Sequence, residues 1–169
     1  MAIRTILHYP DPRLRVKAEP VKEVTPAIAH LLDDMAETMY AAPGVGLAAT
    51  QIGENVRVFI IDTAGEDEPS NLIEFINPEI VGRDGEQTWS EGCLSFPGVH
   101  EDIKRASTVT VRAQRRDGSR FETTADGLLA VAVQHEFDHL DGVLMIDHLG
   151  LLKKRIVNRK MQKQRSASP

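Results

Sequence analysis

Residues 134–139 read Gln-His-Glu-Phe-Asp-His, and this stretch decides how the rest of the chain is interpreted. It falls within a segment, 125–140, whose apolar residues recur at helical spacing before Asp141-Gly142 ends the pattern. On a helix, His135 and His139 lie on one face, one turn apart. Both imidazoles can then reach a single metal ion, and Glu136 can take a proton from a water at that ion. The stretch therefore predicts a metal site on a helix.

A catalytic site of this kind usually has three protein ligands and one open position. Metzincins carry their third histidine at the position that is Met145 here, and a thioether is a poor ligand for a hard or borderline ion. The downstream carboxylates Asp141 and Asp147 lie too close to the helix end for a gluzincin-type ligand. The upstream candidate is Cys93, which follows a glycine. A thiolate with two imidazoles suits Fe(II), Zn, Co or Ni.

A second unusual segment is residues 44–51, Gly-Val-Gly-Leu-Ala-Ala-Thr-Gln. Glycine and alanine let a backbone pass close to a ligand, although a tight turn between two elements explains the same composition. Gln51 is either a surface residue or a donor whose amide N–H stabilises a developing oxyanion. Residues 44–51 alone do not distinguish these interpretations.

The remaining patterns predict an α+β fold: small antiparallel sheets packed around the central metal-binding helix, with a C-terminal helix. Thr25-Pro26 opens a helix that stops near residue 42, and Asp117-Gly118 marks a hairpin turn. A further helix begins near residue 147. The expected strands are 57–62, 72–77 (closed by Pro78), 108–113 and 120–124. No linker divides the chain, so residues 1–169 are expected to form a single domain.

Composition and charge narrow the class of protein. With 41% hydrophobic residues, one cysteine and no apolar run of membrane-spanning length, the chain is expected to be cytoplasmic, without a disulfide and without a membrane partner. The net charge of −5 is unevenly distributed, because residues 151–169 contain no acidic residue. Such a basic tail indicates either an anionic partner or a solvated helix end. Its seven basic residues are Lys153, Lys154, Arg155, Arg159, Lys160, Lys163 and Arg165.

Three motifs, in this order, resemble the signature motifs of peptide deformylases. They are G-x-G-x-A-A-x-Q at residues 44–51, E-G-C-x-S at 91–95 and Q-H-E-x-D-H at 134–139. The resemblance covers nearly the whole chain and extends to residues 8–14, 76–78 and 125–130. The basic C-terminal helix is similar to that of the bacterial type 1 branch.

The resemblance implies a function and a set of roles. Cys93, His135 and His139 would hold a metal, most often Fe(II) in the cell, with Zn, Ni or Co able to replace it. The enzyme would remove the N-formyl group from N-formylmethionyl nascent peptides and release formate. Glu136 would move the proton, while the Gln51 side chain and the Leu94 backbone N–H would stabilise the oxyanion. Separately from the resemblance, the charge distribution predicts that the helix from about Asp147 to Lys163 docks on the ribosome, where formylated chains emerge.

The resemblance also implies a substrate pocket. The backbone of Gly46 would bind the peptide, and the methionine side chain would be lined by Val45, Trp89, Leu128, Val131 and Ala132. For Leu128 or Val131 taken alone, a plain core residue is the favoured interpretation. Glu91 and Arg105 resemble an ion pair that braces the cysteine loop. His100 replaces an arginine of some relatives, which affects the grip on the distal peptide, and the bulk of Trp89 suggests a narrower pocket.

Two other functions remain as alternatives. A metallopeptidase would use the same helix to cleave internal amides, but the missing downstream ligand argues against it. A metal or redox sensor built on Cys93 would need neither Glu136 nor Gln51. Turnover of formyl-Met-Ala beside an unformylated peptide distinguishes a deformylase from the metallopeptidase. A Glu136 variant distinguishes an enzyme, which loses turnover but keeps its metal, from a sensor, which loses little.

Overall fold

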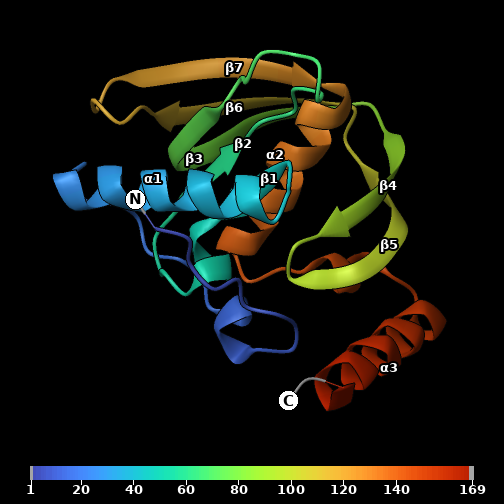
Figure 1. Ribbon diagram of the computed structural model, residues 1–169. Helices are drawn as coiled ribbons and strands as arrows, with labels where there is room; N and C mark the ends of the chain where they lie inside the picture. Colours follow the sequence, from blue (N-terminus) through green and yellow to red (C-terminus); the bar gives the residue numbers. More distant parts are fainter. Residues whose placement is uncertain (1, 168–169) are drawn as a thin grey trace.

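The computed structural model describes residues 2–167 and shows a curved sheet wrapped around a central helix (Figure 1). No helix within these residues is long and apolar enough to cross a membrane. The main helices are α1 (Pro26–Ala41), α2 (Gly127–Leu140) and α3 (Leu151–Ala167). The strands are β1 (Gly46–Ala48), β2 (Val58–Ile61), β3 (Ile73–Asp84), β4 (Gln87–Cys93), β5 (Phe96–Arg105), β6 (Thr108–Gln114) and β7 (Arg120–Asp126).

Five strands form the larger sheet, in the order β1-β2-β3-β6-β7, and every pairing is antiparallel. One face of this sheet buries Phe59, Phe75 and Val111 against Ala130 and Val133 of α2. Helix α1 covers strands β1 and β2 with its stripe of leucines and methionines. The metal-binding motif is therefore carried on a helix held within the core, and the expected α+β architecture is confirmed.

Strands β4 and β5 form a separate two-stranded sheet, which the sequence patterns did not predict. Four of the seven β4 residues are exposed, so the strand lacks the apolar alternation by which strands are recognised. The hairpin is held by Phe96, Val99 and Ile103, which pack with Val157 and Met161 of α3 in a second cluster. This hairpin carries the cysteine to the helix that bears the two histidines.

Three predicted boundaries were wrong. Strand β3 continues through Pro78 to Asp84, because a register shift between Ile76 and Glu79 takes the proline out of regular pairing. Residues 125 and 126 complete β7, so α2 begins two residues later than expected. The segment Met145–His148 is a 3-10 helix, η3, and α3 begins at Leu151 rather than near residue 147.

Candidate metal centre and active site

The structure brings Cys93, His135 and His139 together, although they come from β4 and α2. Their ligand atoms all lie within 4.8 Å of one another. The His139 Nε2 atom is 3.4 Å from the Cys93 Sγ atom and 3.3 Å from the His135 Nε2 atom. Ligands about 2.0 to 2.3 Å from one tetrahedral ion would be separated by roughly 3.3 to 3.7 Å. The spacing and chemistry of these donors therefore fit one borderline metal ion.

Burial and neighbouring charges shift the pKa values of the two histidines in opposite directions. Burial and the adjacent His135 hold the pKa of His139 well below its ordinary value, which favours the neutral imidazole that binds metals. Burial would also lower the pKa of His135, but the charges of Cys93 and Glu136 outweigh it and raise this pKa. Negative charge is thus concentrated around His135, as expected for a site that receives a cation.

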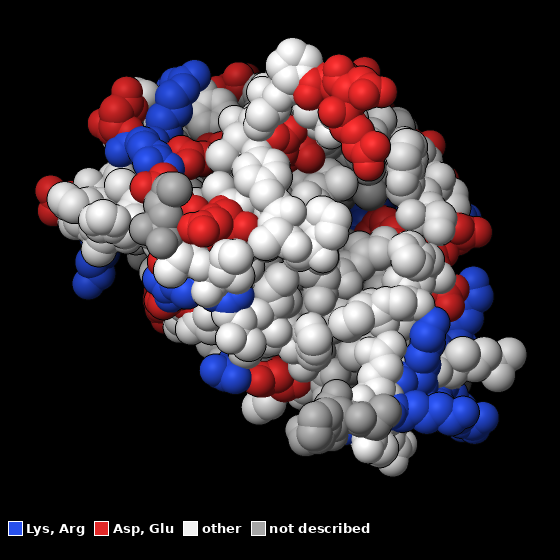
Figure 2. Space-filling model, viewed as in Figure 1, with Lys and Arg blue, Asp and Glu red and all other residues white. Residues whose placement is uncertain are grey.

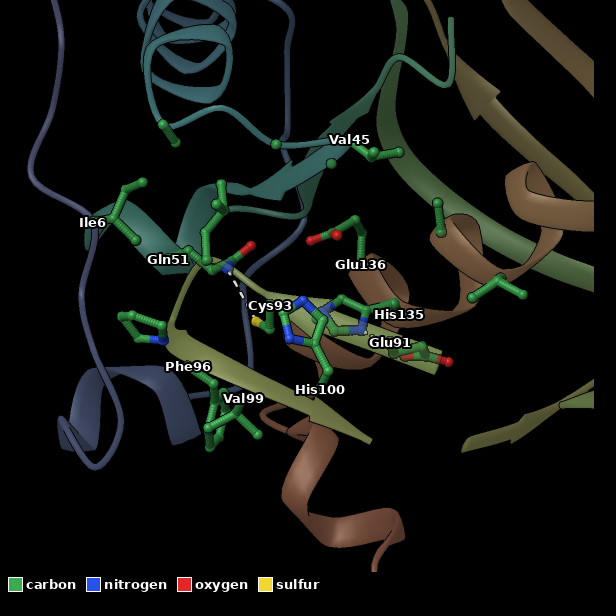
Figure 3. A pocket seen from close by; sticks show the side chains of 18 of the residues that line it. Ile6, Val45, Gln51, Glu91, Cys93, Phe96, Val99, His100, His135 and Glu136 are labelled. Carbon is green, nitrogen blue, oxygen red and sulfur yellow. Dashed lines mark hydrogen bonds and ion pairs between the residues drawn. The ribbon is translucent and has the colours of Figure 1, made fainter. Parts of the chain in front are cut away.

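Glu136 lies beside the metal cluster, and its carboxylate points into the pocket toward Gln51 (Figure 3). Its side chain is buried, and no described residue provides a hydrogen-bond partner for the Oε1 atom. Burial raises the pKa of Glu136 to about 7. A methyl group at Gly46 would lie 2.7 Å from its Oε2 atom, so only glycine leaves the carboxylate this space. The free oxygen is available to a reacting water or substrate.

Gln51 is buried beside Cys93. The backbone N–H of Ala48 donates to its Oε1 atom at 2.9 Å, which fixes the orientation of the amide. The Nε2 atom is consequently turned toward the site, 3.1 Å from the Ser95 Oγ atom and 3.6 Å from the Cys93 Sγ atom (Figure 3). The surface interpretation of Gln51 is wrong, because its exposed fraction is 1%.

A pocket of about 830 Å³ opens over the cluster, and Figure 2 shows the molecule hollowed between α1 and the β4–β5 hairpin. Val131 and Ala132 are buried in its wall, whereas Trp89 and Val45 keep 39% and 41% of their surface exposed at the mouth. His100 is an exposed residue of the same lining. The pocket contains every predicted catalytic and substrate-binding residue, namely Val45, Gly46, Gln51, Trp89, Leu94, Leu128, Val131, Ala132 and Glu136.

The expected pair of Glu91 and Arg105 is present and fully buried, with two hydrogen bonds of 2.8 and 2.9 Å. The structure adds a contact that the sequence did not predict, because the Nδ1 atom of His135 lies 2.9 Å from Glu91 Oε1. Arg105 also reaches Asp138, which in turn contacts His148. Asp138, within the HExxH motif, was the sequence signal for this network. Residue spacing could not show that Arg105 is its partner.

The raised pKa of Glu136 predicts a pH dependence of stability. In metal-free protein the folded state retains the Glu136 proton up to about pH 7, while the unfolded chain releases it near the ordinary glutamate pKa of 4.5. The stabilisation from this proton is complete below pH 4.5 and is lost as pH rises to about 7, at a cost on the order of 3 kcal/mol. We expect metal-free Glu136→Gln to be more stable than the parent at pH 8 by up to this amount.

Urea unfolding of both chelator-treated proteins between pH 4.5 and pH 8 measures the difference. Groups remote from the site titrate equally in both proteins, so the difference in free energy of unfolding reports on Glu136 and on His135, whose pKa the Glu136 charge raises. Parallel curves at all pH values would contradict the assignment of a strongly raised pKa to Glu136.

The fold and the cluster define an α+β protein with a candidate metal centre on its central helix. A family model described as polypeptide deformylase matches residues 3–155. A peptide deformylase of Xylella fastidiosa is 52% identical over 168 residues, covering 98% of both chains. One of Alkalilimnicola ehrlichii is 53% identical over 163 residues, covering 96% of this chain and 91% of that one. The chain therefore belongs to the peptide deformylase family.

Solved structures agree with this membership. A peptide deformylase from Legionella pneumophila superimposes with a TM-score of 0.92 at 46% identity, covering 99% of this chain and 100% of that one. A peptide deformylase from Ehrlichia chaffeensis, solved in complex with actinonin, has a TM-score of 0.92 at 35% identity, with coverages of 97% and 98%. The expected resemblance is confirmed over nearly the full length.

Proposed function

We propose that this protein removes the N-formyl group from the N-terminal formylmethionine of nascent polypeptides and releases formate. The observation that supports this function most directly is the convergence of Cys93, His135 and His139 at one pocket. Beside them lies the Glu136 carboxylate, whose Oε1 atom has no hydrogen-bond partner among the described residues. Membership of the peptide deformylase family supports the same reaction. The proposal places the enzyme in the cytoplasm, where nascent chains emerge.

In the proposed mechanism, Cys93, His135 and His139 hold the metal. Iron(II) is the proposed ion in the cell, and Zn, Ni or Co can take its place; when bound, the metal polarises the formyl group and acidifies water. Glu136 takes the proton of the attacking water and delivers it to the leaving amine. The Gln51 amide and the Leu94 backbone N–H donate to the oxyanion.

The backbone of β1 is suited to hold the peptide. This strand is at the edge of the sheet, and its partner β2 lies on one side only. Because the Val45 carbonyl accepts from the Asp62 N–H, the alternation of antiparallel pairing turns the backbone groups of Gly46 toward the free edge. An extended peptide can add there as a strand, with its methionine among Val45, Trp89, Leu128, Val131 and Ala132.

The reaction is tested by supplying formyl-Met-Ala, acetyl-Met-Ala and an unformylated peptide to the metal-loaded enzyme. We expect rapid formate release from the first and little reaction with the others, because the proposed reaction acts on the formyl group alone. Cleavage of internal amides would favour a metallopeptidase. Absence of turnover with all three, in protein that still binds metal, would favour a sensor and overturn the proposal.

We further propose that α3 docks the enzyme on the ribosome. Basic side chains gather along α3, at the lower right of Figure 2. Val157 and Met161 of this helix pack inward, but Leu151, Leu152 and Ile156 are 77%, 72% and 53% exposed. These three residues therefore do not pack on the domain as the alternative required, while its other part, that the charges are only solvated, stays open. The helix presents basic and apolar side chains together on its outer face.

Exchange of Arg155, Arg159 and Lys163 for glutamine is expected to weaken ribosome co-sedimentation and leave turnover of formyl-Met-Ala unchanged. These side chains are exposed, so the inner contacts of α3 remain. Each phosphate contact contributes a slope of roughly −0.7 to −0.9 in log affinity against log salt, so the variant should lose about two to three units of slope.

A matched control exchanges three exposed basic residues outside α3, Lys17, Lys22 and Arg120, for glutamine. The two triple variants have the same net charge, so a general charge effect would weaken both. Equal co-sedimentation of both variants and the parent at low salt would show that α3 is only a solvated helix.

A further inference from the structure

A continuous line of hydrogen bonds leads from a candidate metal ligand to the surface. The Nδ1 atom of His135 is 2.9 Å from the Glu91 carboxylate, which accepts two hydrogen bonds from Arg105. The Nη1 atom of Arg105 donates to Asp138 Oδ2 at 2.6 Å. The same Oδ2 atom lies 2.9 Å from the Nε2 atom of His148. Each member is thus in direct contact with the next.

Burial decreases along this line. The side chains of Glu91 and Arg105 are 3% and 4% exposed, and those of Asp138 and His148 are 23% and 32% exposed. The outer end lies in a separate pocket, of about 460 Å³, that is lined by Arg105, Asp138 and His148 and shares no residue with the substrate pocket. The buried Glu91–Arg105 pair joins the two, because Glu91 lines the substrate pocket and Arg105 lines the separate one. His148 therefore cannot touch a substrate, and any effect it has on catalysis must pass through its neighbours.

The geometry at Asp138 gives His148 a definite role. One oxygen of Asp138 accepts from both Arg105 and His148, whose nitrogen atoms are 3.5 Å apart. The histidine must present its Nε2–H to the carboxylate, since an ionised carboxylate can only accept a hydrogen bond. Because two donors hold the Asp138 carboxylate, this carboxylate fixes the orientation of the Arg105 guanidinium. The guanidinium in turn holds both oxygens of Glu91.

We propose that His148 is a positioning residue, which sets the orientation of the ligand His135 through Asp138, Arg105 and Glu91. The inference rests on the proposed function only in that it takes His135 to be a ligand. A histidine ligand depends on the partner of its second ring nitrogen, and loss of such a partner typically costs 10- to 100-fold in metal affinity or activity. Because His148 lies three residues farther out, we expect roughly a 3- to 10-fold effect.

The test compares His148→Phe, which removes the donor, with His148→Gln, whose side-chain N–H can still reach Asp138. Metal affinity is measured by competition with a chelator, beginning from metal-free protein. The phenylalanine variant should bind Zn(II) 3- to 10-fold more weakly, and the glutamine variant should recover most of this loss. The visible absorption spectrum of the Co(II) form should shift in His148→Phe, because the field at the metal depends on ligand orientation.

A double-variant cycle identifies the route. If His148 acts through Asp138, then Asp138→Asn combined with His148→Phe should bind metal no more weakly than Asp138→Asn alone. His30→Gln serves as the control, since His30 is an exposed residue of α1 that belongs to neither pocket. Unfolding of the metal-free variants shows whether stability alone has changed.

Unchanged metal affinity and an unchanged Co(II) spectrum in His148→Phe would overturn the inference and leave an ordinary surface ion pair. Additive losses in the double variant would also overturn it. These readouts do not depend on turnover, so failure of the deformylase proposal would be recognised separately, by a parent enzyme that binds metal and releases no formate.

Discussion

Glu136→Gln is expected to lower the kcat for formyl-Met-Ala by about 10²- to 10⁴-fold, because glutamine cannot accept the proton of the attacking water. The Oε1 atom of Glu136 has no hydrogen-bond partner within the described part of the chain, and burial brings its pKa to about 7. A base is most effective when its pKa is near the working pH. Metal content should be unchanged, since Glu136 is not among the three clustered ligands.

Turnover and metal content are therefore measured on the same preparations. Glu23→Gln is the matched control, because Glu23 is an exposed carboxylate outside the pocket. Near-normal deformylation by the metal-loaded Glu136 variant would remove the general base from the mechanism. Loss of metal together with loss of turnover would give Glu136 a structural role instead.

The second large effect is expected at Gln51. Gln51→Met preserves the length of this buried side chain but removes the Nε2–H donor that Ala48 orients toward the cluster. Loss of one oxyanion donor typically costs 10²- to 10³-fold in kcat. The KM for formyl-Met-Ala should change little, because the donor acts mainly on charge that develops in the transition state.

Gln87→Met is the control for removing a hydrogen-bonding glutamine. Gln87 bonds to the carbonyls of Ala106 and Gly127 and lies outside the substrate pocket. Its variant should retain turnover. A Gln51 variant with an increased KM and an unchanged kcat would place the amide in ground-state binding and contradict an oxyanion role.

The local features of the site could be predicted from the sequence. Residues four apart on a helix share a face whatever surrounds them, so His135 and His139 could be paired from their spacing. The apolar recurrence before them identified α2, and the Asp117-Gly118 turn identified the β6–β7 hairpin. Pro78 was misleading, because a bulge in β3 accommodates it at a point that local propensity does not specify.

The approach of Cys93 to the histidines depends on tertiary structure. Its thiol chemistry and the preceding glycine made the cysteine a candidate, and only the family resemblance made it a ligand. The hairpin that carries it is stabilised by contacts with α3, more than fifty residues away in the sequence. A strand with so many exposed residues gives no local signal, and its position is determined by packing between distant elements.

The sequence alone determined the HExxH helix, the α+β class and the basic tail, because each follows from the order of neighbouring residues. The tertiary structure decided that Gln51 is buried, that Glu91 meets His135, and that Arg105 connects them to Asp138 and His148. Those contacts form when β4, β5, α2 and η3 converge. Their formation depends on long-range packing and hydrogen-bond geometry, which residue spacing does not contain.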